Sequence, residues 1–202
     1  KIPFSPNSDI LPAWSPEAFF DTMVVNGNTW PKLDVAPERY RFRILNACDS
    51  RVLNLALMID DDDGGSGHEL PFFVIGSDQG LLPRVVLVRT GYARKLDPAA
   101  GENPLLNNED ATSKNEFYNN NKSSSNIQSL LVTPAERYDV IVDFSNLSHG
   151  TKITLVNTGP DAPFQTFSSP EYEPANYGTT GQIMQFVIDE SLHNPNGDPS
   201  TP

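Results

Sequence analysis

The sequence predicts an all-β protein folded as a Greek-key β-sandwich or barrel. Short apolar runs alternate with turn residues along the 202-residue chain, which contains 18 prolines and 13 glycines. No segment shows a convincing helical period, whereas Arg39 to Leu45 alternates strictly between charged and apolar residues. Many short strands separated by turns are typical of a sandwich.

The packed part is expected to begin near Thr22, with the apolar run TMVV ending at the turn signal Asn26-Gly27-Asn28. The alternation from Arg39 to Leu45 places the aromatic residues on one face of a strand and the arginines on the other. Apolar runs bounded by turn residues predict further strands, for eight or nine in all. These strands are expected at 52–59, 70–75, 85–88, 128–132, 138–144, 152–157 and 181–188.

Changes in composition divide the chain into three parts. Residues 1–20 contain four prolines without regular period, which predicts a linker or extended strap. Residues 21–189 are predicted to form the folded domain, with a long, polar insertion at about 89–126 that we expect to be mobile. Residues 190–202 repeat the linker composition. Because the chain begins at Lys1 rather than Met, we expect it to be a piece of a longer polypeptide.

The charge and cysteine content exclude several classes of function. A net charge of −12, with only 14 scattered Lys and Arg residues, argues against binding nucleic acid or an anionic membrane. No run approaches 18 apolar residues, so no membrane span is predicted. The single cysteine, Cys48, excludes an internal disulfide framework.

Two segments share a pattern. VAPERYRFRILN, from Val35, and VTPAERYDVIVDF, from Val132, both contain a proline, then Glu-Arg-Tyr, then an alternating strand. In each, the proline ends the preceding strand and the tyrosine begins a buried face, with its hydroxyl free to reach a backbone partner. We interpret the two segments as paired edges of a Greek key.

Four motifs in order carry a family resemblance: DTMVVNGNTWPKLDVAPERYRFRILNACDSR, FFVIGSDQGLLPR, LLVTPAERYDVIVDF and GQIMQFVI. They resemble the second, middle cupredoxin domain of three-domain multicopper oxidases of the spore-coat laccase and bilirubin-oxidase type. The resemblance covers about Asp21 to Ile188, apart from the insertion. It implies a cupredoxin fold and flanking cupredoxin domains of the same polypeptide as partners.

The resemblance also implies a function. The whole enzyme would oxidise phenolic, bilirubin-like or metal-ion reductants and reduce dioxygen to water, with copper in its other domains. This chain would be a copper-free, non-catalytic spacer that forms part of the wall of the substrate entrance. By resemblance, the parent would be secreted, periplasmic or located on a spore coat.

The histidines and the cysteine agree with an absence of copper ligands here. A blue-copper site requires two His, one Cys and usually an axial Met, and a multinuclear cluster requires closely spaced His pairs. His68, His149 and His193 are far apart, and no histidine follows Cys48 closely. We therefore expect no cofactor in this chain, and Cys48 to be a small apolar residue at a strand end.

The best-matching motifs contain candidates for structural roles. Asp78 and Arg137 have opposite charges, and we expect an ion pair or loop-fixing hydrogen bonds rather than catalysis. An ion pair would tie the GSDQG turn to the start of the strand at Tyr138. The structural candidates are Asp78, Arg137, Tyr138, Asn26, Gly27 and Asn46.

Three other functions are to be compared with the residues: a binding module, a calcium site and a hydrolase. A free-standing sandwich that binds carbohydrate or protein would use exposed Trp14, Trp30, Tyr172 and Tyr177 as its platform. A calcium loop at Asp60–Gly64 lacks carboxylates at both ends of the EF-hand frame, which favours a solvated hairpin tip. A hydrolase would need a Ser, His and acid arrangement that the sequence does not offer.

Overall fold

The structure, a computed structural model, describes residues 17–60, 69–88, 130–165 and 174–193. Most of the expected N-terminal strap (1–20) and C-terminal linker (190–202), nearly all of the Asp60–Gly64 tip and the insertion at 89–126 lie outside these ranges. The described strands are β1 (Val24–Val25), β2 (Asn28–Thr29), β3 (Lys32–Val35), β4 (Arg39–Leu45), β5 (Leu53–Asp60), β6 (Glu69–Leu70), β7 (Phe72–Ser77), β8 (Gly80–Val88), β9 (Leu130–Val132), β10 (Arg137–Asp143), β11 (Lys152–Asn157) and β12 (Gln182–Ile188).

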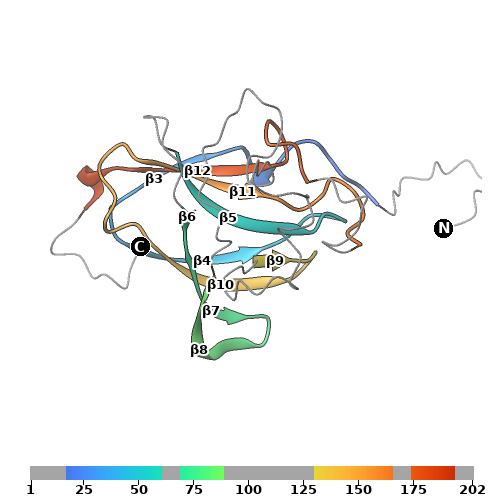
Figure 1. Cartoon of the computed structure of the whole chain (residues 1–202), viewed down its shortest axis with the longest axis horizontal. Coiled ribbons are helices and arrows are strands. Elements are labelled where there is room, and N and C mark those ends of the chain that lie inside the picture. The colour runs from blue at the N-terminus through green and yellow to red at the C-terminus, as the bar shows by residue number, and fades with distance from the viewer. Residues whose placement is uncertain (1–16, 61–68, 89–129, 166–173, 194–202) are drawn as a thin grey trace, which may run out of the picture.

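Two sheets form the layers of a sandwich, one above the other in Figure 1. The four-stranded sheet has the order β4-β10-β7-β8, and the six-stranded sheet has the order β3-β12-β11-β5-β6, with β9 also paired to β5. Neighbouring strands are mostly far apart in sequence, and β3 and β12 are the only pair among the described strands that runs parallel. The predicted all-β sandwich is confirmed, because the described residues are nearly all in strands or turns.

The alternation in β4 is confirmed and produces one charged face. Arg39, Arg41 and Arg43 are exposed, and the residues between them are half-buried. Arg41 donates from Nε to Asp139 Oδ1 of β10 at 2.8 Å, and this hydrogen bond, with the guanidinium charge, lowers the pKa of Asp139. Arg39 pairs with Asp143 in the same way at 2.7 Å. Opposite charges across an antiparallel pair therefore help to fix its register.

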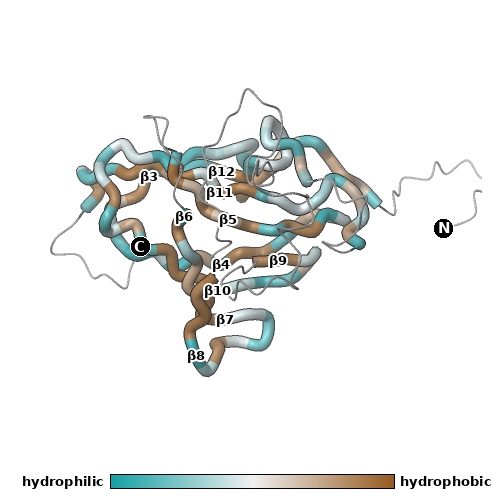
Figure 2. Tube along the Cα trace, in the orientation of Figure 1, coloured by the Kyte–Doolittle hydropathy of each residue, from teal (hydrophilic) through white to brown (hydrophobic). Residues whose placement is uncertain are grey.

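Apolar side chains from both sheets meet between the layers. Phe144 and Phe186 are 0% and 3% exposed, and their ring centroids lie 5.4 Å apart. Figure 2 shows hydrophobic stretches along strands of both layers. In β5 the first six residues are all buried, because neighbouring strands flank it on its edges and both of its faces are covered.

The sequence did not predict three of the strands, and it predicted a fourth with the wrong length. β2, β3 and β6 were not expected, because they are short or polar and acquire strand geometry only through pairing, as β3 does with β12. β8 extends over Gly80–Val88 rather than 85–88, because the chain before Val85 continues along β7 to the turn at Ser77–Gly80.

The interpretation of the repeated segments as two edges is wrong for one of them. β4 is an edge strand, but β10 lies between β4 and β7, and the two repeated strands pair with each other. Their tyrosines also differ. Tyr40 Oη accepts a hydrogen bond from the backbone N of Ala36 at 2.8 Å. Tyr138 instead interacts with Glu136, and burial together with that carboxylate raises its pKa.

The chain leaves the sandwich at a short 3-10 turn, Glu190–Leu192, whose first N–H groups are capped by Asp189. Asp189 Oδ1 accepts from the backbone N of Ser191 at 2.9 Å. In the described part of the chain, no helix has the length and apolar character needed to cross a membrane.

Replacing Tyr40 by Phe should lower the free energy of unfolding by about 1–3 kcal/mol, because the N–H of Ala36, a residue only 2% exposed, loses its acceptor. Urea unfolding of the purified chain measures this change. The matched control, Tyr138→Phe, should cost less than about 1 kcal/mol, because its hydroxyl partner Glu136 can be solvated. Equal losses of unfolding free energy in the two variants would show that the Tyr40 hydroxyl contributes no more to stability than the Tyr138 hydroxyl.

Candidate functional site

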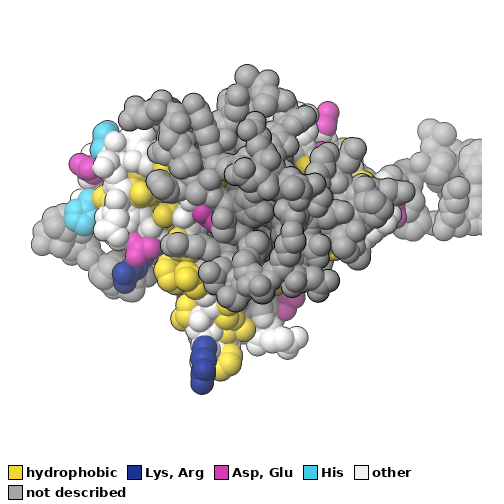
Figure 3. All heavy atoms as spheres, in the orientation of Figure 1, with side chains coloured by type: hydrophobic (Ala, Val, Ile, Leu, Met, Phe, Trp, Pro, Cys, Tyr) yellow, Lys and Arg dark blue, Asp and Glu magenta, His cyan; other side chains and the backbone are white. Residues whose placement is uncertain are grey.

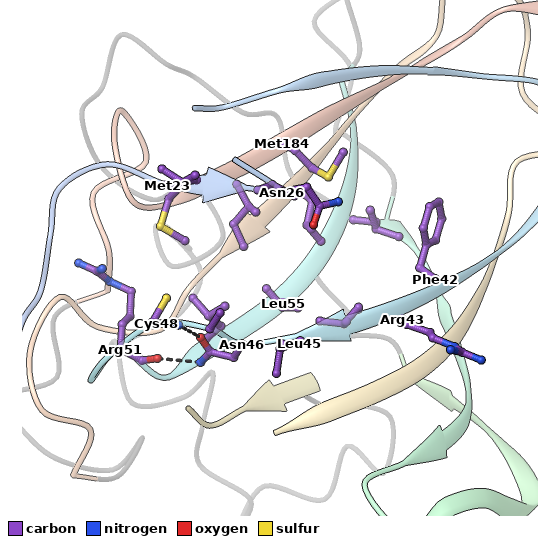
Figure 4. A pocket seen from close by; sticks show the side chains of 18 of the residues that line it. Met23, Asn26, Phe42, Arg43, Leu45, Asn46, Cys48, Arg51, Leu55 and Met184 are labelled. Carbon is purple, nitrogen blue, oxygen red and sulfur yellow. Dashed lines mark hydrogen bonds between the residues drawn. The ribbon is translucent and has the colours of Figure 1, made fainter. Parts of the chain in front are cut away.

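A cleft of about 890 Å³ lies between the two sheets of the described structure. Apolar side chains of β5, β10 and β12 form its floor and walls, and the β1–β2 ribbon and the turn from Asn46 to Arg51 lie at its rim. Figure 4 shows Met23, Cys48 and Arg51 at one end of the cleft and Phe42 at the other. A cleft of this size and polarity can receive a small organic molecule or the side chains of a protein partner.

The rim of the cleft carries exposed apolar residues. Phe20 is 71% exposed, Val24 59% and Leu45 56%, and all three line the cleft. We call these three residues the cleft mouth. Exposed apolar residues along the lining of an apolar cleft mark a surface that another protein segment can cover.

Local turn chemistry positions the ribbon at the rim. Asn26 and Gly27 both have positive φ, 50° and 84°, and connect β1 to β2 as a two-residue hairpin. This is the type I′ geometry that suits the twist of the strands, and Asn-Gly adopts it more readily than other dipeptides. These two residues therefore hold β1, with Val24 and Val25, at the mouth of the cleft.

Asn46 connects three segments at the other side of the rim. The residue is 1% exposed, and its Nδ2 donates to the carbonyl oxygens of Arg51 and Val132 at 2.8 and 2.9 Å. Its Oδ1 accepts from the backbone N of Cys48 at 3.0 Å (Figure 4). A buried amide with all these partners fixes the turn after β4 to β9.

Arg51 is a buried cation at the end of the cleft. Its side chain is 4% exposed, and its guanidinium lies 2.8 Å from Asp161 Oδ1. The other carboxylate oxygen of Asp161 accepts from Thr180 Oγ1 at 2.6 Å, and the Arg51 guanidinium also lies 5.7 Å from the ring centre of Phe19. No sequence pattern indicates this site, because residues 51 and 161 are far apart in the chain and meet only through the fold.

The structure brings Asp78 and Arg137 together at the start of β10. Asp78 Oδ1 lies 3.0 Å from Arg137 Nε and accepts from the Arg137 backbone N at 2.9 Å. The side chains are 38% and 57% exposed, so solvent screens the pair. The turn at Asp78 is therefore tied to β10 mainly through the backbone hydrogen bond.

The structure contradicts part of the proposed aromatic platform of a binding module. Tyr177 is 4% exposed and packs against Met58 and Val156, and burial raises its pKa. Trp30 is 42% exposed, but its indole N–H donates to the carbonyl oxygens of Thr179 and Gln182. Trp14 and Tyr172 lie outside the described residues.

Comparison with known proteins gives a consistent result. The chain is 34% identical over 180 residues to the Multicopper oxidase LPR1 homolog 1 of Oryza sativa subsp. japonica, covering 89% of this chain and 21% of that protein. It is 33% identical over 193 residues to a laccase of Bacillus subtilis, covering 94% of this chain and 25% of the laccase. The chain is homologous to the multicopper oxidases. No family model matches it.

A solved structure supports the fold. The McoA multicopper oxidase of the hyperthermophile Aquifex aeolicus superposes with a TM-score of 0.52 at 23% identity, covering 87% of this chain and 27% of that one. The predicted cupredoxin type of sandwich is confirmed by this neighbour. The chain spans about a fifth to a quarter of the length of the multicopper oxidases that it matches.

Multicopper oxidases carry copper, but the described residues of this chain do not fit that metal. Burial raises the pKa of the Cys48 thiol against the opposing charge of Arg51, whereas copper binds a thiolate. No histidine lines the described cleft, and His193 Nδ1 lies 2.6 Å from Glu38 Oε1 elsewhere. Among residues that the structure describes, no three His, Cys, Asp or Glu side chains form a group that could hold a metal ion.

The double-mutant cycle of Asp78→Asn and Arg137→Gln should give a coupling energy below about 1 kcal/mol, because the pair is exposed. Denaturant unfolding of the four proteins measures it. Asp78→Ala should cost more than Asp78→Asn, because only the amide can still accept from the Arg137 backbone N–H. A coupling of about 3 kcal/mol or more would mean that the pair is buried in solution.

Cys48 should react with iodoacetamide more slowly in the folded chain than in the urea-unfolded chain at pH 8. Burial raises the pKa of the thiol, so less thiolate is present in the folded protein at that pH. The rate should rise with pH to a midpoint above the ordinary thiol value of about 8.5. A midpoint lower in the folded chain than in the unfolded one would indicate an activated cysteine.

Proposed function

We propose that this chain is the middle cupredoxin domain of a multicopper oxidase, and that it acts as a copper-free spacer between two flanking domains of the same polypeptide. The observation that carries the proposal is the cleft mouth, where Phe20, Val24 and Leu45 are more than half exposed. A domain that functions alone gains nothing from such residues in water, whereas an interface between domains buries them.

Two further observations support the proposal. The chain matches about a quarter of a laccase over nearly all of its own length, which leaves the other parts of such an enzyme to other domains. The cysteine and histidines within the described ranges lack the surroundings that copper requires. The motifs that resemble the middle domain also run in the same order as in that domain.

The parent enzyme would couple two half-reactions. Phenolic, bilirubin-like or metal-ion reductants each lose one electron, and four electrons with four protons reduce one dioxygen to two waters. The copper in the flanking domains would supply this electron transfer. Residues of this chain would fix the separation of those domains, because reacting groups lose rate when they are misplaced by about 1 Å.

The same proposal assigns to this chain part of the wall around the substrate entrance. This part rests on the family resemblance, together with the apolar lining of the cleft, which suits aromatic reductants better than hydrated ions. The domain division at residues 21–189, with linkers on both sides and an insertion at about 89–126, belongs to the same proposal.

The test compares this 202-residue chain with the longer polypeptide that contains it. The chain alone should bind no stoichiometric copper, show no blue thiolate-to-copper absorption and consume no dioxygen with a phenolic reductant. The longer polypeptide should bind stoichiometric copper, show the blue thiolate-to-copper absorption and consume dioxygen with the phenolic reductant. Metal analysis, visible absorption and oxygen-electrode traces on matched preparations measure these outcomes.

The spacer role has its own variant. Val24→Lys in the longer polypeptide should lower oxygen consumption while copper content stays the same, because a charge at the cleft mouth disturbs an interface rather than a ligand. The matched control is Leu192→Lys, since Leu192 is also about half exposed, at 51%, but does not line the cleft. A blue band from the chain alone, or full activity in Val24→Lys, would contradict the proposal.

A further inference from the structure

The β8 strand projects from the sandwich with apolar residues in the open. Leu81 is 74% exposed, Val85 60%, and Val86 and Leu87 44% each. We call Leu81 to Leu87 the β8 arm. Figure 1 shows the β7–β8 hairpin at the free edge of the four-stranded sheet, below β4 and β10, and Figure 3 shows hydrophobic side chains, in yellow, along it.

The pattern of exposure shows that both faces of β8 are uncovered from Pro83 to Leu87, whereas Leu82 is half-buried against the core. Successive side chains of a strand point to opposite faces, so a strand packed on one side exposes every second residue. Here five consecutive residues, Pro83 to Leu87, are all exposed, and only Val88 at the base is buried. The arm therefore has apolar surface on two sides, and a single packed layer would cover only one of them.

The backbone edge of the arm is poorly suited to pairing with another strand. β8 ends the four-stranded sheet, so its outer edge has no partner strand among the described residues. The pairing with β7 shifts register between Val74 and Gly76, and Pro83 and Arg84 lie in this irregular part of β8. A proline without N–H and an exposed arginine at an edge oppose extension of the sheet. Side-chain packing, not strand addition, is the contact that the arm can make.

The β7–β8 hairpin is held firmly at its turn, at the end away from Val88. A Cβ atom on Gly76 would lie 3.1 Å from both Asp139 Cβ and the carbonyl oxygen of Gly80, so the hairpin packs closely on β10. Asp78 adds its hydrogen bond from the Arg137 backbone N at 2.9 Å. A projecting element that is already ordered loses little conformational entropy when it docks.

We propose that the β8 arm is a docking element that inserts its apolar residues into a neighbouring domain of the same polypeptide. The inference rests on the proposed function, and it adds a second contact surface to the cleft mouth. Figure 1 places the arm at one end of the four-stranded sheet, and its residues do not line the cleft. The two surfaces can therefore serve two different flanking domains.

The size of the arm favours a tethered domain over a free partner or a second copy. Four partly exposed aliphatic side chains supply only part of the roughly 800 Å² per partner that a stable, independent interface buries. A covalent linkage supplies the missing affinity by raising the effective concentration of the partner. Two copies of this chain would also bring together two net charges of −12.

The experiment measures the rate of maleimide labelling of single cysteines placed at Val85 or Leu87, in a Cys48→Ser background. Each variant is prepared both as this 202-residue chain and in the longer polypeptide. Val24→Cys, at the cleft mouth, is prepared in the same two forms and reports on the proposed function independently. Cysteine at an exposed strand position is a mild change, so these variants should fold.

Labelling at Val85→Cys and Leu87→Cys should be fast in the dilute chain and at least about tenfold slower in the longer polypeptide, a ratio that corresponds to about 1.4 kcal/mol of protection. If Val24→Cys is protected in the longer polypeptide while both arm positions stay fast, the arm inference is wrong and the spacer proposal stands. If none of the three positions is protected there, the proposed function fails as well.

Two other occupants of the arm would give different results. Slow labelling of the arm in the dilute 202-residue chain would mean that this chain covers its own arm, which overturns the inference. Protection that appears only as the concentration of the 202-residue chain rises would mean that a second copy is the partner, which also overturns it.

Discussion

A cluster of aromatic rings between the sheets is the interaction on which the rest of the structure depends. Phe42 of β4 lies 5.4 Å, between ring centroids, from Phe186 of β12, and Phe144 lies 5.4 Å from the same ring. Tyr40 adds an edge contact to Phe144 at 5.8 Å. Such pairs contribute about 0.5–1.5 kcal/mol each beyond their buried area. The cluster therefore joins the four-stranded sheet to the six-stranded sheet and sets their spacing.

The cleft opens where this cluster ends. Near the turn from Asn46 to Arg51, the buried Asn46 amide holds the rim of the cleft by hydrogen bonds. Aliphatic side chains in this part line a hollow rather than fill it. The same spacing that closes the core at one end leaves an apolar cleft at the other end. The aromatic cluster that stabilises the fold and the cleft to which the spacer role is assigned thus lie toward different ends of the sandwich.

Local patterns in the sequence were sufficient for much of the fold. The alternation of β4 and the Asn26-Gly27 turn reflect steric and hydrophobic preferences of a few neighbouring residues, and the structure has both. β3 could not be predicted from the sequence, because its polar stretch becomes a strand only by pairing with β12, some 150 residues away. The cleft could not be predicted either, because its walls come from strands spread over the whole chain.

The sequence by itself determined that the chain is an all-β domain related to laccases, since strand periodicity, turn chemistry and ordered motifs are properties of contiguous residues. Only the tertiary structure decided which apolar residues remain in the open. Val85, Val86 and Leu87 belong to a predicted apolar strand, and the structure leaves all three exposed. Hydropathy gives a residue's preference for burial, but the packing of distant strands determines whether anything covers it.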